Sequence, residues 1–157
     1  MSAPQTLDRA GIAQRIPHSG SMSLLERLES WDADAIHCST TTHAQVGNPL
    51  RTESGLLAPN AIEYAAQAMA LHGGLLAVEG STPSAGFLAS ARNVELSVAR
   101  LDDVPGALQV RAQRLSGDAR QILYAFTVAA DDGRMLAEGR AVVVLNTPLA
   151  TESTPSP

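Results

Sequence analysis

The chain has 157 residues, which is enough for one domain with a hydrophobic core. Hydrophobic residues make up 45% of it and aromatic residues only 3%, so small aliphatic side chains must form most of that core. The formal net charge is −5, and all 11 basic residues are Arg. Because these form no basic stripe, the sequence argues against nucleic acid or an anionic membrane as the main partner.

The chain order predicts one helix-centred domain over residues 7–147, with flexible tails at 1–6 and 148–157. The expected elements are a short helix at 8–14, strands at 22–31 and 35–43, a loop at 44–58, a helix from about 59 to 77, a linker at 80–85, and strands at 87–99, 107–115, 121–130 and 135–145. Turns rich in Gly, Pro and Asp separate the last four strands. A glycine pair, Gly73-Gly74, is expected to interrupt the long helix near its end.

No signal peptide is predicted, since the first residues carry neither a basic start nor an apolar run. No stretch approaches the roughly 20 apolar residues needed to cross a bilayer, so we expect a soluble, cytoplasmic protein with no membrane partner. Cys38 is the only cysteine. It therefore forms no internal disulfide, no cysteine-based metal site is predicted, and we expect no cofactor.

The long helix carries the strongest functional signal. It is apolar nearly all round, and Glu63 is its only charge, with Gln67 one turn later on the same face. A helix of this kind is usually buried, and burial raises the pKa of a carboxyl group toward the range of a general acid. The alternative is that Glu63 lies on a thin polar stripe in the first helical turn, where the helix dipole favours negative charge.

Two strands, one apolar helix and four further strands predict an α+β protein with an antiparallel sheet curled around the helix. This is the hotdog architecture. A single curled sheet leaves an edge strand unpaired, so we expect a dimer in which edge strands pair across the interface.

Three segments carry a family resemblance. They are Ile16-Pro17-His18 with Leu24-Leu25-Glu26-Arg27, the helix motif Glu63-Tyr64-Ala65-Ala66-Gln67-Ala68, and Gly86-Phe87-Leu88 with Ala91-Arg92-Asn93 and the turn Val104-Pro105-Gly106. Together they resemble the hotdog 3-hydroxyacyl-acyl-carrier-protein dehydratases over roughly residues 14–146. The branch they resemble most is the dehydratase-like proteins of aryl polyene biosynthesis.

The resemblance implies that a 3-hydroxyacyl thioester on acyl carrier protein is dehydrated to the 2-enoyl thioester. Glu63 would then be the acid, and the N–H groups near residues 59–62 would face the thioester oxygen. One departure is clear, because the family's loop His, 14 residues before the helix acid, is replaced by Pro49. The segment before the helix also departs from the family, with Leu57-Ala58-Pro59 in place of Met-Pro-Gly.

The missing base must then come from elsewhere, and His18 and His43 are the candidates. A structural role for His18 and a surface position for His43 are the alternatives. His37 and His72 are expected to be uninvolved, and Tyr64 to belong to the core or the interface. The residues expected to contact substrate are Pro59, Asn60, Gln67 and Arg92, with Arg51 or Arg92 near the carrier's phosphate.

Three functions remain open at this point. The first is dehydration with a rearranged base. The second is a catalytically impaired hotdog subunit that partners an active dehydratase, which the missing loop His favours. The third is acyl-thioester hydrolysis. The expected partners are acyl carrier protein and a hotdog subunit, in a homodimer or a heterodimer.

Overall fold

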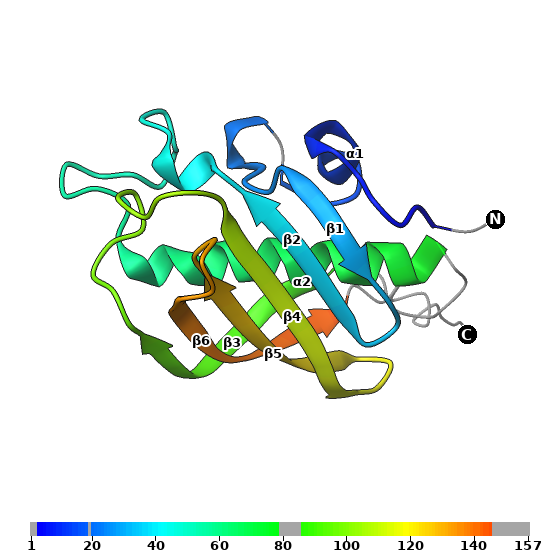
Figure 1. The fold of residues 1–157 in the computed structure, drawn as a ribbon. Coiled ribbons are helices and arrows are strands. Elements are labelled where there is room, and N and C mark those ends of the chain that lie inside the picture. The colour runs from blue at the N-terminus through cyan, green and yellow to red at the C-terminus, as the bar shows by residue number, and fades with distance from the viewer. Residues whose placement is uncertain (1–2, 19, 79–85, 146–157) are drawn as a thin grey trace, which may run out of the picture.

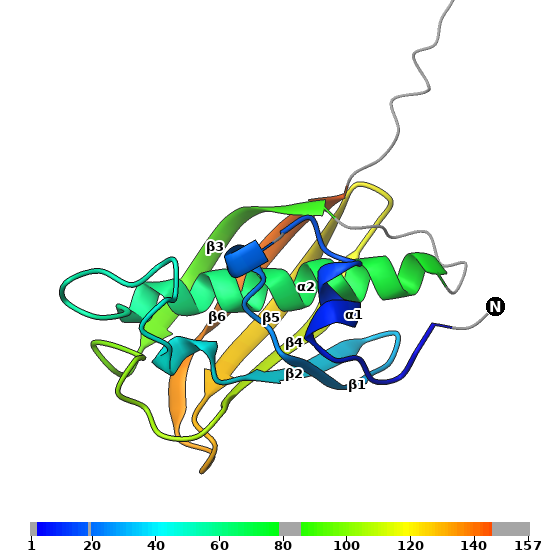
Figure 2. The same ribbon diagram turned by 90° about the horizontal axis from the view of Figure 1, so that it is seen from above.

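A computed structural model describes residues 3–18, 20–78 and 86–145. The long helix α2, Ala61–Val78, lies across one face of a six-stranded sheet in which every pair of neighbouring strands is antiparallel (Figure 1). From above, the sheet curls around the helix, with β3 on one side of it and β1 and β2 on the other (Figure 2). The expected α+β arrangement of a sheet wrapped around one long helix is confirmed.

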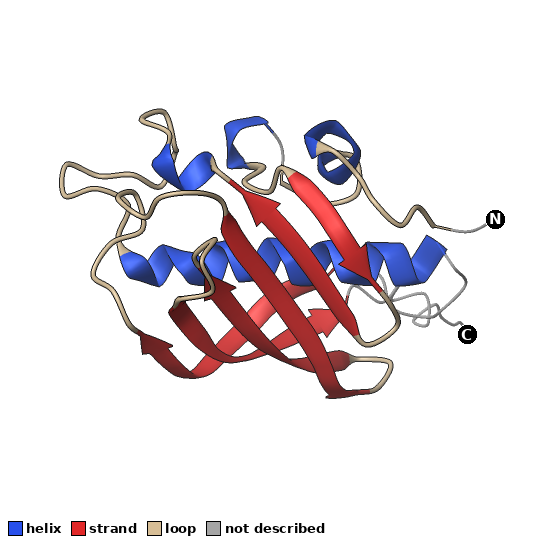
Figure 3. Cartoon of the chain, in the orientation of Figure 1, coloured by secondary structure: helices blue, strands red, loops and turns tan. Residues whose placement is uncertain are grey.

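The strands are β1 (Arg27–Trp31), β2 (Ala35–Thr40), β3 (Gly86–Leu96), β4 (Leu108–Gly117), β5 (Gln121–Ala129) and β6 (Met135–Leu145), in the spatial order β1-β2-β4-β5-β6-β3. The short helices are α1 (Arg9–Ala13), η1 (Gly20–Met22), η2 (Thr42–Ala44) and η3 (Ala58–Asn60) (Figure 3). Asp8 caps α1 by accepting the Gly11 N–H at 2.9 Å, so the expected first helix is confirmed.

Alternate residues of the strands point at α2 and form the core with it. Ile36, Val110 and Phe126 are buried on the sheet side, and Ala65, Leu71 and Leu75 are buried on the helix side. The expected helix break at Gly73-Gly74 is wrong, because α2 continues to Val78. A side chain at Gly74 would place its Cβ 3.2 Å from the Arg15 carbonyl oxygen, so glycine here allows the N-terminal segment to approach the helix closely.

The first expected strand, 22–31, is wrong over its first half. Only Arg27–Trp31 is a strand, because side chains occupy the backbone groups of the preceding residues. The Leu24 N–H donates to the Gln67 side chain, and the Leu24 carbonyl accepts from the hydroxyls of Thr40 and Thr42. The second strand ends at Thr40, and His43 lies in η2.

The two edges of the sheet differ. The Leu28 N–H of β1 donates to the Leu7 carbonyl, so the N-terminal segment covers part of that edge. Ala3 is buried, and the Trp31 indole N–H donates to the Pro4 carbonyl at 2.8 Å, so the described part of the first expected tail packs on the domain. The opposite edge is β3, whose 11 residues pair only with β6 in the described chain. Dimerisation through paired edge strands stays a prediction. The second expected tail and the 80–85 linker lie outside the described residues.

No helix in the described ranges combines the length and the apolar character that crossing a bilayer requires. The domain limits at 7 and 147 stay predictions.

The buried thiol of Cys38 gives a first testable result. Burial on the core face of β2 raises its pKa to about 12, and the charge of Glu29 adds to the shift. Because the thiolate is the reactive form, we expect no labelling of the native protein by a thiol reagent at pH 8 and complete labelling in denaturant. Intact mass measures both states, and stoichiometric labelling of the native chain within minutes would contradict the buried position.

Candidate active site

The side chains of Glu63 and His18 are in contact at the start of α2. Glu63 lies in the first turn of the helix, and His18 lies in the segment before η1. Glu63 Oε2 is 3.0 Å from His18 Nε2. The expected imidazole therefore lies one hydrogen bond from the carboxylate, within a single chain.

The pair is only half-buried, which differs from the expected deep burial of Glu63. The side chain of Glu63 is 32% exposed and that of His18 is 26% exposed. Along this part of α2, Ile62, Glu63 and Ala66 are all partly exposed, because the sheet covers the other side of the helix. The alternative of a thin polar stripe in the first turn therefore fits the single chain better. An apolar tunnel around Glu63 would need a second subunit.

Gln67 holds Glu63 and the backbone of residues 22–24 in place. Its side-chain N–H groups donate to Glu63 Oε2 at 3.1 Å and to the Met22 carbonyl at 2.7 Å. Its side-chain oxygen accepts the Leu24 N–H at 2.9 Å. Gln67 is fully buried and its amide is engaged within the chain, so its expected contact with substrate stays a prediction. It positions the carboxylate and the segment that follows His18.

The structure does not bring His43 to Glu63. His43 is fully buried in η2, and its Nε2 hydrogen-bonds to the Val104 carbonyl at 2.9 Å. Burial lowers the pKa of His43 below its ordinary value, which disfavours the charged imidazole. The expected place of His43 as a base beside Glu63 is therefore wrong, and the alternative of a surface position is wrong as well. The bond to Val104 gives this side chain a structural role.

The other two histidines also lie in separate places. His72 is buried between the Tyr124 hydroxyl and the Asp32 carbonyl, each at 2.7 Å. His37 on β2 pairs with the Gln109 side chain at 2.7 Å. Neither contacts Glu63 within the described residues, and the expectation that both are uninvolved stays a prediction.

The N–H groups at the start of the helix are used differently from the expectation. Pro59 has no N–H, and the Asn60 N–H donates to the Leu57 carbonyl at 3.0 Å. The Ala61 N–H is taken by the turn of η3. In the part of the chain that the structure describes, the Leu57 N–H has no acceptor. Leu57 therefore provides a free backbone donor directly before η3, whereas Asn60 does not.

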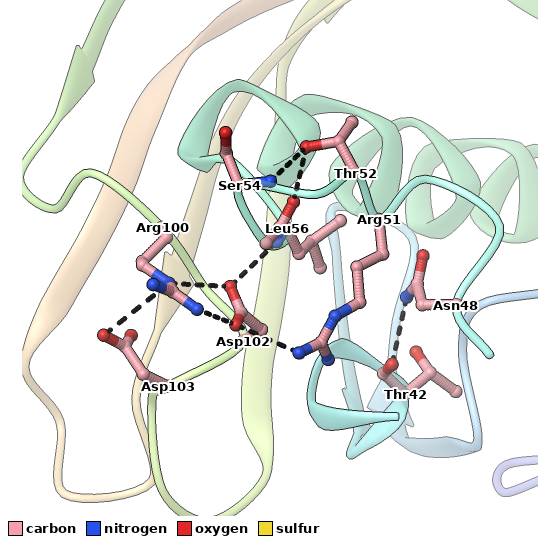
Figure 4. A network of polar contacts seen from close by, with 10 residues as sticks. Thr42, Asn48, Arg51, Thr52, Ser54, Leu56, Arg100, Asp102 and Asp103 are labelled. Carbon is pink, nitrogen blue, oxygen red and sulfur yellow. Dashed lines mark hydrogen bonds and ion pairs between the residues drawn. The ribbon is translucent and has the colours of Figure 1, made fainter. Parts of the chain in front are cut away.

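The segment before α2 is anchored at Leu56 by a cluster of charged side chains around Asp102 (Figure 4). Asp102 Oδ1 accepts the Leu56 N–H at 2.8 Å, and both Arg100 and Arg51 point their guanidinium groups at this carboxylate. Hydrogen bonds from Arg100 hold the pKa of Asp102 well below its usual range. Sequence analysis missed this cluster.

The loop around Pro49, where the resembled family carries its His, is held by hydrogen bonds to buried groups. Asn48, next to Pro49, donates to the Thr42 carbonyl and to the Tyr64 hydroxyl, each at 3.0 Å. Tyr64 is fully buried and also bonds to the Thr42 hydroxyl at 2.8 Å. The expectation that Tyr64 belongs to the core is confirmed, and this loop offers no titratable side chain at Pro49.

Arg92 stays a prediction as a phosphate contact. It is exposed on β3 and lies directly opposite Arg140 of β6. Arg51 faces Asp102 at 3.5 Å, so its charge is partly neutralised within the chain.

A hollow of about 440 Å³ lies elsewhere, over β1, β2, β4 and β5. Small side chains such as Ala35, Ala125 and Thr127 leave it open, and Arg111 and His37 contribute polar groups. None of the expected site residues lines it, so it is separate from the Glu63–His18 pair.

The sheet wrapped around α2 is the fold of the hotdog dehydratases and thioesterases, and solved structures of both kinds are similar to this chain. The family model for ApeP-like proteins, described as ApeP dehydratase, matches residues 10–153. The chain belongs to this ApeP-like dehydratase family. The resemblance to the dehydratase-like proteins of aryl polyene biosynthesis is thereby confirmed.

Among solved structures, the chain is similar to the dehydratase heterocomplex ApeI:P from Xenorhabdus doucetiae, with 24% identity and a TM-score of 0.76. That match covers 88% of this chain and 92% of the other. A hypothetical thioesterase with coenzyme A from Streptococcus pneumoniae is 13% identical, with a TM-score of 0.56 over 76% of this chain and 84% of the other. The PaaI protein of the E. coli phenylacetic acid degradation operon is 14% identical, with a TM-score of 0.55 over 74% and 80%. At these identities the likeness shows the fold. No curated protein matches the chain.

Proposed function

We propose that this chain takes part in dehydrating a 3-hydroxyacyl thioester, carried on acyl carrier protein, to the 2-enoyl thioester. The pathway would be fatty-acid-like, of the aryl polyene type. The observation that carries the proposal is the 3.0 Å contact between Glu63 Oε2 and His18 Nε2 at the start of α2. Family membership supports the reaction class.

A carboxyl group and an imidazole in contact can serve both halves of this elimination. The imidazole takes the proton alpha to the thioester, and the Glu63 carboxyl group gives its proton to the departing hydroxyl, which leaves as water. The pair is then an imidazolium and a carboxylate. Transfer of one proton across the 3.0 Å contact restores the starting state. The free Leu57 N–H is a donor for the negative charge that develops on the thioester oxygen.

We propose further that the working unit is a dimer with a second hotdog dehydratase subunit. One solved structure that is similar over 88% of this chain comes from a dehydratase heterocomplex, and Pro49 stands where the wider family has a catalytic His. A partner subunit that carries a loop His would supply a base next to the partly exposed Glu63. In that case His18 would orient Glu63, and Glu63 would remain the acid.

The test is to incubate the purified chain with a 3-hydroxyacyl thioester of acyl carrier protein, alone and together with a second hotdog dehydratase from the same source. Intact mass of the carrier then reports the product. Loss of one water in either sample supports the proposal. Loss of water only in the sample that contains both proteins indicates that the heterodimer is the active unit. Release of the whole acyl group would indicate a thioesterase, and an unchanged carrier in both arms would overturn the dehydratase assignment.

A further inference from the structure

The Asp102 carboxylate is nearly buried although it carries a charge. Its side chain is only 3% exposed. It accepts hydrogen bonds from the Leu56 N–H at 2.8 Å and from Arg100 Nε at 3.1 Å, and Arg51 Nη2 lies 3.5 Å away (Figure 4). A buried charge is tolerated when it is paired and hydrogen-bonded in this way.

These contacts fasten the segment that leads directly into the catalytic helix. Next to the Asp102 bond, the Leu101 N–H donates to the Leu56 carbonyl at 2.7 Å, and the Ala58 N–H donates to the Ala99 carbonyl at 3.0 Å. Leu56 and Ala58 are buried, whereas Leu57 between them is 40% exposed. In this antiparallel pairing the Leu57 N–H points away from residues 99–101, so it stays free.

The backbone at Gly55 is shaped to admit Asp102. Gly55 has φ +97, and a Cβ there would lie 2.5 Å from Asp102 Oδ1 and 2.9 Å from Arg100 Nη2. Only glycine combines this left-handed conformation with room for the carboxylate. Gly55 and Asp102 lie far apart in the sequence, and the glycine makes room for the contact between the Asp102 carboxylate and the Leu56 N–H.

We infer that Asp102 is a positioning residue for the reaction, which fixes the first turn of α2 and so places Glu63 and the free Leu57 N–H toward the substrate. This inference rests on the proposed function. Glu63 lies only seven residues after Leu56, in the first turn of a helix whose preceding segment has no other side-chain anchor of this kind in the described chain. A displacement of about 1 Å in a catalytic group costs on the order of 100-fold in rate.

The charge of Asp102 is essential to this role. Asn at this position keeps the size but leaves Arg51 and Arg100 facing a neutral amide. The Leu56 N–H then competes with two guanidinium groups for a single weaker acceptor. We expect the segment 55–58 to shift while the rest of the core is unaffected.

The experiment compares D102N and G55A with D118N in the full chain, assayed with the 3-hydroxyacyl thioester of acyl carrier protein and, where needed, the second hotdog subunit. Asp118 is the matched control, because its carboxylate also accepts two backbone N–H groups, at 2.7 and 3.0 Å, but in the β4–β5 turn. All rates are measured well below the lowest melting temperature of the set.

We expect D102N and G55A to lower kcat about 10- to 100-fold with KM within about 3-fold, and D118N to leave kcat unchanged. D102E should recover part of the rate. The pH midpoints of kcat should stay the same in D102N, because Asp102 makes no contact with the Glu63–His18 pair. Amide hydrogen exchange at residues 56–61 should rise in D102N and stay at the wild-type level in D118N.

Equal effects of D102N and D118N on kcat, or a D102N rate that falls only in proportion to the folded fraction, would overturn the positioning role. Unchanged exchange at residues 56–61 in D102N would overturn it as well. A wild-type chain with no turnover in any arm would instead refute the proposed function, and the exchange result would still decide whether Asp102 holds the helix start.

Discussion

We expect that replacing Glu63 with Gln will lower kcat for the proposed dehydration about 100- to 10,000-fold and leave the fold and the subunit assembly intact. This is the expected contribution of a general acid–base group. Gln keeps the volume and can still accept from His18 and Gln67, which lie 3.0 and 3.1 Å from Glu63 Oε2. It cannot supply a proton to the leaving hydroxyl. Loss of water from a 3-hydroxyacyl carrier thioester, followed by intact mass, gives the rate.

Glu138→Gln is the control, because Glu138 is exposed on β6 and its replacement removes the same charge from the surface of the sheet. It should leave kcat within about 2-fold of wild type, as expected for a surface substitution. A Glu63→Gln variant with wild-type turnover in the complete assembly would rule out Glu63 as the acid.

The second large effect that we expect is a decrease in the free energy of unfolding as the pH falls below about 6.5. Burial lowers the pKa of both His43 and His72 below the ordinary value of 6.5, although the nearby carboxylates of Asp102 and Asp32 oppose the shift. The unfolded chain therefore binds more protons than the folded one once the pH falls below that value. The stabilising contribution is complete above pH 6.5 and is lost on acidification, by up to about 1.4 kcal/mol per pH unit for each histidine.

Denaturant unfolding between pH 5.5 and 8 measures this effect, with the fluorescence of the single tryptophan, Trp31, as the signal. Trp31 packs edge-on against His72 with ring centroids 6.2 Å apart, so it reports on that part of the core. The slope of unfolding free energy against pH should be smaller in His72→Gln and in His43→Gln than in wild type. A wild-type free energy that stays constant from pH 7 to 5.5 would contradict the buried neutral state of these side chains.

The sequence predicted the helix and the strands well, because composition and turn chemistry act locally. An apolar segment without β-branched runs favours a buried helix, and each Gly- or Pro-containing turn marks a strand end. Glu63 was identified by the same local argument, as the only charge in that helix. The family motif then pointed to His18, which lies 45 positions earlier.

The missed features all depend on contacts between distant residues. Gln67 bonds to Met22 and Leu24, and this prevented the expected strand from starting at Met22. Asp102 bonds to the backbone of Leu56, 46 positions away, and no pattern in either segment indicates that pairing. His43 was a candidate base with a surface position as the alternative, and both were wrong because nothing local reveals the Val104 carbonyl that it contacts.

The position of Gln67 has an evolutionary consequence. Its buried amide is shared between the partly exposed Glu63 carboxylate and the backbone of Met22 and Leu24, so the proposed acid is hydrogen-bonded to a buried group. A lineage that no longer used the reaction would still lose stability by discarding Glu63, since a buried donor of Gln67 would be left unpaired. Loss of His18 would cost less, because its Nε2 contacts only the partly exposed Glu63 carboxyl group and its Nδ1 has no partner in the described chain. Drift in a subunit released from catalysis would therefore erase His18 first and keep Glu63 for longer. Among descendant proteins, the presence or loss of His18 would therefore indicate retained or lost activity more reliably than the presence of Glu63.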